Sequence, residues 1–117
     1  MVYLYVALGG ALGAMGRFFI SSLVAFPYGT MAVNIIGSFL MGVLFVTLID
    51  RLDQRASLFL MTGVLGGFTT FSAFSLDVFK LFEADRLGFA GLYVALSVSG
   101  ALAALWIGII VARGGQS

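Results

Sequence analysis

The sequence has little charge and contains neither cysteine nor histidine. Only 9% of its 117 residues are charged, whereas a soluble domain has about 25%. A soluble fold needs polar residues to cover its exterior, and this chain cannot supply them. The missing cysteine and histidine exclude disulfides, thiolate metal sites and catalysis by either side chain. A net charge of +1 also provides no basic surface for nucleic acid.

Long apolar runs take the place of the missing charge. The chain is 62% hydrophobic, with a mean hydropathy of +1.16. Because a spanning helix needs about 20 mostly apolar residues, we predict an all-α membrane protein, a single four-span domain over residues 1–117. The first run has no basic segment before it, so we interpret it as a span and not as a signal peptide. The predicted spans are 2–24, 30–49, 58–80 and 88–112, joined by a tight turn at 26–29 and polar loops at 50–57 and 83–87.

Glycines within the spans predict close helix packing. Gly9 and Gly13 are four residues apart, and so are Gly63 and Gly67. This spacing allows two helix backbones to approach closely in lipid.

The third apolar stretch has an unusually polar interior at residues 63–75. Paired glycines at 66 and 67, followed by Thr69 and Thr70, lower the helix propensity there. We therefore predict a broken third transmembrane helix. Irregular backbone at membrane depth is tolerated only when it is buried in protein or lines a cavity. Its freed carbonyls suit a hard cation, and helix N-termini favour anions.

Two phenylalanines follow this predicted break. Phe71 and Phe74 are three residues apart, so they share a face if the helix resumes there. An aromatic ring has a positive edge, and ring edges that face a pore would attract a small anion without a counter-charge. Taken alone, the pair would be ordinary packing against lipid or core, but the neighbouring glycines and hydroxyls weaken that interpretation.

Other polar residues within the spans allow two interpretations each. Asn34 lies one turn inside the second span and either bonds to a neighbouring helix or lines a pathway. Arg17 either anchors the first span at the membrane surface or attracts anions in an aqueous vestibule. Tyr93 and Ser97, on one face of the fourth span, either continue a polar line or are packing residues.

The loop charges are balanced. With four spans, Arg51, Arg55 and Arg113 lie on one side of the membrane, and Arg17, Lys80 and Arg86 lie near the other. The positive-inside rule needs an excess of such charges on one side. We therefore expect insertion in both orientations and pairing of two antiparallel copies, unless a detail such as the depth of Arg17 sets one orientation.

Three segments carry a family resemblance. They are Gly-Ala-Met-Gly-Arg at 13–17, Val-Asn-Ile-Ile-Gly-Ser-Phe at 33–39 and Gly-Gly-Phe-Thr-Thr-Phe-Ser-Ala-Phe at 66–74. With them, the chain resembles the Fluc (CrcB) family of fluoride channels over essentially its whole length.

The resemblance implies an antiparallel, dual-topology homodimer in the prokaryotic plasma (inner) membrane. Its lipid-embedded subunits would share two fluoride pathways. It also implies a structural sodium ion, Na⁺, held at the dimer centre by the backbone carbonyls of Gly66 and Thr69. This sequence has Ala73 where the family often has threonine, so Ser72 or Ser75 would have to replace that hydroxyl. The implied pathway residues are Arg17, Asn34, Thr70, Phe71, Ser72, Phe74, Tyr93 and Ser97.

The function implied by the resemblance is passive, fluoride-selective export, which lowers the toxic accumulation of fluoride in the cytoplasm. A small dual-topology multidrug exporter of cationic compounds is an alternative, but it would need a carboxylate inside the first span. An accessory membrane protein would not need the polar break. An enzyme is disfavoured because no nucleophile–base pair is visible.

Overall fold

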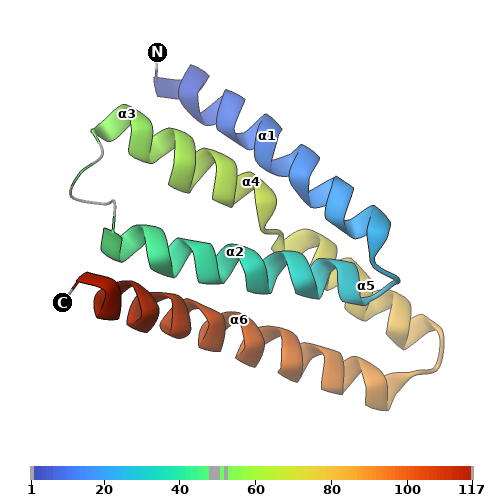
Figure 1. Ribbon diagram of the computed structural model, residues 1–117. Coiled ribbons are helices and arrows are strands. Elements are labelled where there is room, and N and C mark those ends of the chain that lie inside the picture. Colours follow the sequence, from blue (N-terminus) through green and yellow to red (C-terminus); the bar gives the residue numbers. More distant parts are fainter. Residues whose placement is uncertain (1, 48–50, 52, 117) are drawn as a thin grey trace.

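The computed structural model, which describes residues 2–47, 51 and 53–116, is all-helical in those residues (Figure 1). Four helical stretches are long and apolar enough to cross a membrane, which confirms the prediction of four apolar helices. The helices are α1 (Val2–Leu23), α2 (Tyr28–Thr47), α3 (Gln54–Ser57), the π-helix η1 (Leu58–Leu65), α4 (Gly66–Phe68), α5 (Phe71–Glu83) and α6 (Leu87–Gln116).

The helix ends differ from the predicted ends at several places. The third stretch begins at Gln54, within the predicted loop, because the Asp53 side chain accepts a hydrogen bond of 2.8 Å from the Ala56 N–H and caps α3. The last helix continues to Gln116, beyond the predicted end at residue 112. The predicted end of the second span at residue 49 lies outside the described residues.

The helices form a thin slab, with extents of 48 × 35 × 19 Å. Helix α1 packs along η1 and α4, while α2 packs along α6. The two ends of the chain lie at the same end of the slab (Figure 1). Since one helix with its side chains is about 10–12 Å across, the short dimension accommodates roughly two helices. Large apolar side chains of α1, α2, α5 and α6 are exposed.

The two predicted glycine pairs face each other across the contact between α1 and the third stretch. A Cβ atom added to Gly9 would lie 2.9 Å from the Gly63 Cα, and one added to Gly67 would lie 2.6 Å from the Gly10 carbonyl oxygen. Real Cβ atoms do not approach backbone this closely. The prediction of close helix packing at these glycines is confirmed.

The third stretch changes its packing partner along its length. Its first part, η1 and α4, contacts α1, whereas α5 contacts α6 and also the start of α2. The buried residues of this second contact are Phe74, Leu81, Ala90 and Tyr93. The segment between α4 and α5 therefore lies where the chain passes from one neighbour to another.

Candidate functional site

Two residues between α4 and α5, Thr69 and Thr70, have extended backbone. The φ and ψ angles are −83° and 154° at Thr69 and −152° and 124° at Thr70. We call this pair the 69–70 segment. Helix α5 starts directly after it, because the Thr70 hydroxyl accepts a hydrogen bond of 3.1 Å from the Ala73 N–H. Threonine is a favoured residue at this capping position.

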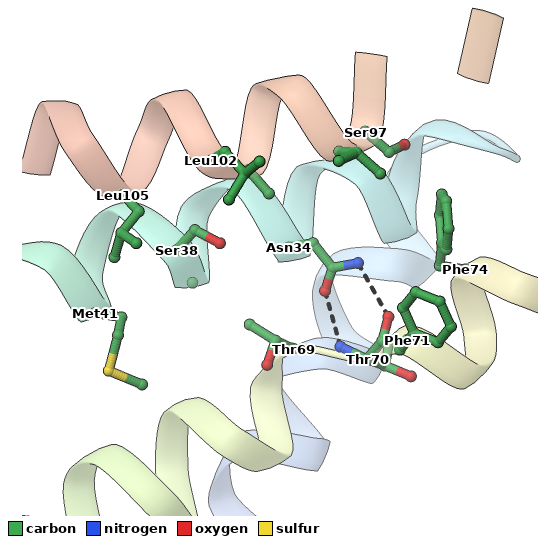
Figure 2. Close-up of a pocket in the computed structure, with 13 residues that line it drawn as sticks. Asn34, Ser38, Met41, Thr69, Thr70, Phe71, Phe74, Ser97, Leu102 and Leu105 are labelled. Atoms are coloured by element: carbon green, nitrogen blue, oxygen red, sulfur yellow. Dashed lines mark hydrogen bonds between the residues drawn. The ribbon is translucent and has the colours of Figure 1, made fainter. Parts of the chain in front are cut away.

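Asn34 of α2 holds the 69–70 segment by two hydrogen bonds. Its Nδ2 donates to the Thr70 carbonyl oxygen at 3.0 Å, and its Oδ1 accepts from the Thr70 N–H at 2.8 Å. Figure 2 shows the side-chain amide facing the Thr70 backbone. Both bonds require the same orientation of the amide, so the pairing also fixes which atom is oxygen and which is nitrogen.

Arg17 of α1 contacts the last turn before the segment. Its Nε donates a hydrogen bond of 3.2 Å to the Gly67 carbonyl oxygen. The preceding Leu65 carbonyl accepts from both the N–H and the hydroxyl of Thr69, each at 3.0 Å. Arg17 is half-buried, and its Nε is directed into the contact between α1 and α4.

Two carbonyls of this region have lost their usual helical donors. In a continuous α-helix, the Gly66 carbonyl would accept from the Thr70 N–H and the Thr69 carbonyl from the Ala73 N–H. Here the Thr70 N–H donates to Asn34 Oδ1, and the Ala73 N–H donates to the Thr70 hydroxyl. Those two carbonyls are thereby released from the helical pattern, as a backbone cation site requires.

A groove of about 460 Å³ runs beside the segment, between α2, α6 and the start of α5. Its wall is mainly apolar, with a few amide and hydroxyl groups from α2, the 69–70 segment and α6 (Figure 2). The lining residues are Asn34, Gly37, Ser38, Met41, Thr69, Thr70, Phe71, Phe74, Ser97, Val98, Ala101, Leu102 and Leu105.

The two phenylalanines after the segment have opposite exposures. The Phe71 side chain is 76% exposed, whereas Phe74 is 7% exposed. Their ring centroids are 5.5 Å apart, with the planes tilted by 49°. Phe74 also stacks on Tyr93, at 5.5 Å and 26°. Phe74 is therefore held in one orientation by α6, while Phe71 extends from the subunit at the groove.

Two hydroxyl residues of α6 lie near Phe74. Tyr93 is buried, and its hydroxyl donates to Asp77 Oδ2 at 3.1 Å. Ser97 is also buried and lines the groove, and within the described part of the chain its hydroxyl has no hydrogen-bond partner. The Ser97 side chain thus places a buried hydroxyl beside the groove, on the same face of α6 as Tyr93.

The groove brings together five of the eight predicted pathway residues: Asn34, Thr70, Phe71, Phe74 and Ser97. Among the described residues, the other three lie outside its lining. Ser72 bonds to the Thr70 hydroxyl at 3.1 Å, Tyr93 lies behind Phe74, and Arg17 contacts Gly67.

Sequence reasoning missed Asp77 and the apolar wall of the groove. Asp77 is not among the predicted site residues, but it lies near the middle of α5 and is buried against Tyr93. Its position three residues after Phe74, on the same face of α5, was the available signal. Met41, Leu102 and Leu105 are ordinary apolar residues, and no local pattern distinguishes them.

Comparison with known proteins gives one consistent result. Residues 4–109 match the family described as "CrcB-like protein, Camphor Resistance (CrcB)". A protein of Cereibacter sphaeroides named "Fluoride-specific ion channel FluC" is 55% identical in an alignment that covers 95% of this chain and 94% of that protein. Proteins with the same name from Rhodopseudomonas palustris and Opitutus terrae are 47% and 48% identical, each over 97% of this chain and over 98% and 93% of their own lengths.

Proposed function

The chain belongs to the CrcB-like family and is a multi-pass membrane protein, and from this premise we propose that it is a passive, fluoride-selective channel. The observation that carries the proposal is the similarity, at up to 55% identity over most of the chain, to proteins named as fluoride-specific ion channels. Ion channels are not enzymes. The alternative of a small multidrug exporter needs a carboxylate in the first span, and α1 contains none.

The groove beside the 69–70 segment is the proposed fluoride pathway. Fluoride is small and strongly hydrated, so a selective route must replace its water with donors and positive ring edges. The hydroxyl of Ser97 and the rings of Phe71 and Phe74, which belong to residues that line the groove, are the proposed groups. The N-terminal end of α5, which begins at Phe71, adds a partial positive charge.

Two antiparallel copies would form the working channel, with two pathways that each use both subunits. The exposed apolar side chains of α1, α2, α5 and α6 and the exposure of Phe71 would allow a second copy to form one wall of each pathway. The near balance of loop charges supports insertion in both orientations. Because Arg17 is bonded within the helix contact, the loop residues that remain in the comparison are Arg51, Arg55 and Arg113 against Lys80 and Arg86.

A structural sodium ion is proposed at the centre of the dimer. The carbonyls of Gly66 and Thr69 fit such an ion, because the donors that would occupy them in a helix are bonded to other groups. The interrupted third transmembrane helix would thus provide carbonyl oxygen ligands for a hard cation. We expect replacement of Na⁺ by a large organic cation to lower the dimer's thermal stability, and substitution of the Thr69 side chain to preserve its Na⁺ dependence. Loss of that dependence only when the hydroxyl is removed would argue against carbonyl ligation.

The proposed direction of net flow is out of the cell. Fluoride crosses the membrane as its neutral weak acid and ionises inside, so the anion accumulates there. A passive pore lets the trapped anion leave down its gradient without ATP or a coupled proton.

The experiment that tests this function is ion efflux from proteoliposomes of the purified chain, read with ion-selective electrodes. Liposomes loaded with fluoride should release it rapidly, whereas chloride-loaded liposomes should match protein-free controls. Equal release of both anions, or no fluoride release, would contradict the proposal.

A further inference from the structure

The Asn34 amide is already half engaged within the subunit. An asparagine amide has two donor hydrogens and an acceptor oxygen with two lone pairs. One hydrogen bonds the Thr70 carbonyl and one lone pair bonds the Thr70 N–H, at 3.0 and 2.8 Å. A side chain that only solvated an anion would need donor hydrogens alone, because its acceptor oxygen repels an anion. The bond from the Thr70 N–H to the Asn34 oxygen would then serve no purpose.

The Thr70 backbone controls the groups on both sides of it. In a continuous helix its N–H would donate to the Gly66 carbonyl. Its hydroxyl caps α5 by accepting a hydrogen bond from the Ala73 N–H. The next residue is Phe71, whose ring lies at the groove. A rotation of the Thr70 peptide would therefore move a pathway ring and change which carbonyls are free.

Helix α2 also packs closely against the 69–70 segment at Gly37. A Cβ atom added to Gly37, one turn from Asn34 on α2, would collide with the Thr69 Cγ2 atom and lie 3.2 Å from the Phe68 Cδ2 atom. The amide pairing is thus made where the backbone of α2 at Gly37 packs directly against the side chains of Phe68 and Thr69. Asn34 faces Thr70 at a fixed distance and does not need to reach across open space.

We propose that Asn34 is a positioning residue for fluoride conduction. It acts through the Thr70 backbone, which it holds extended so that Phe71 and the start of α5 lie at the groove. This inference rests on the proposed fluoride conduction, but the contact itself can be tested without any ion.

The first experiment measures unitary fluoride current in planar bilayers in a double-mutant cycle. The two changes are Asn34→Ala and an amide-to-ester replacement at the Thr70 nitrogen, which removes the N–H donor and leaves the Thr70 side chain unchanged. A hydrogen bond contributes about 1 kcal/mol, or roughly a fivefold effect. The factor by which Asn34→Ala lowers the unitary current should therefore be about fivefold smaller in the ester background than in the native backbone. Additive effects would overturn the proposal and assign Asn34 to direct contact with fluoride.

The unitary current separates positioning from a merely structural role. A residue needed only for folding changes the number of active channels and leaves the current through each one unchanged. The matched control is Thr47→Val on the same helix, since the Thr47 hydroxyl donates to the carbonyl of Val43 one turn earlier, at 2.8 Å. It should leave the unitary current unchanged. If Asn34→Ala does so as well, and lowers only the number of channels, the proposal is wrong.

The second experiment needs no ion flux. Hydrogen–deuterium exchange of the Thr70 amide should be about fivefold faster in Asn34→Ala than in the native chain, and unchanged in Thr47→Val. Unchanged exchange in Asn34→Ala would show that Asn34 does not protect the Thr70 N–H, and the proposal would be wrong. A native chain with no fluoride current but with the expected exchange would overturn the proposed function and keep Asn34 as the residue that holds the 69–70 segment.

Discussion

Substitution of Gly67 by alanine tests the close contact that places the 69–70 segment. An alanine Cβ at this position would lie 2.6 Å from the Gly10 carbonyl oxygen, 3.0 Å from the Gly10 Cα and 3.2 Å from its carbonyl carbon. All three atoms belong to the backbone, so no side chain can rotate away. Helix α1 and helix α4 must move apart by several tenths of an ångström.

The expected cost follows from two opposing effects. Overpacking of a well-packed contact costs about 1–3 kcal/mol, and replacing a helical glycine by alanine returns about 1 kcal/mol. The net loss of unfolding free energy should therefore be about 0–2 kcal/mol, and the loss relative to a glycine-to-alanine change without overpacking about 1–3 kcal/mol. Fluoride efflux should also fall, because the Gly67 carbonyl would move away from the Arg17 Nε that donates to it at 3.2 Å.

The matched control is the glycine on the other side of the same contact. A Cβ on Gly10 would meet nothing within 4 Å, so Gly10→Ala should be neutral or stabilise the protein by up to about 1 kcal/mol. Unfolding by SDS in mixed micelles, followed by circular dichroism, compares the two variants with the native chain. Equal stability of Gly67→Ala and Gly10→Ala would refute the close contact and the reasoning built on it.

Three further changes have defined outcomes. Phe71→Ile or Phe74→Ile should sharply reduce fluoride efflux from proteoliposomes while the oligomer elutes normally from a sizing column, and unchanged flux in both would reject the role of the ring edges. Tyr93→Phe removes the bond to the buried Asp77 carboxylate and should cost about 1–3 kcal/mol in the same SDS titration; no loss would mean that the carboxylate has another partner. Thr70→Val removes the cap of α5 and should cost about 1 kcal/mol, whereas Thr70→Ser should keep most of it.

The sequence predicted the parts of the fold that depend on local composition. Apolar length predicts four helices because the hydrocarbon core sets the length of a span. The glycine spacing predicts close helix packing because only glycine allows backbones so close, but it does not say that α1 packs on the third stretch. The helix beginning at Gln54 was missed, since its cap depends on the geometry of Asp53 and not on hydropathy.

From the sequence, the site could be predicted only as a set of residues that are energetically costly or unusual inside membrane spans. Asn34 and Phe74 could be identified because polar groups and ring pairs within spans are costly or unusual, but no sequence pattern says that the Asn34 amide pairs with Thr70. Asp77 was missed because its burial against Tyr93 depends on how α5 packs on α6. Hydrogen bonds between residues that are 16 or 36 positions apart depend on how the helices pack, which one sequence does not reveal.

The reversal potential of the purified channel in a planar bilayer tests the central claim most directly. With fluoride on one side and chloride on the other, a fluoride-selective pore should show a reversal potential that follows the fluoride gradient and does not change with chloride concentration. A reversal potential that follows chloride, or stays near zero as the fluoride gradient is varied, would contradict the assignment of this chain as a fluoride channel.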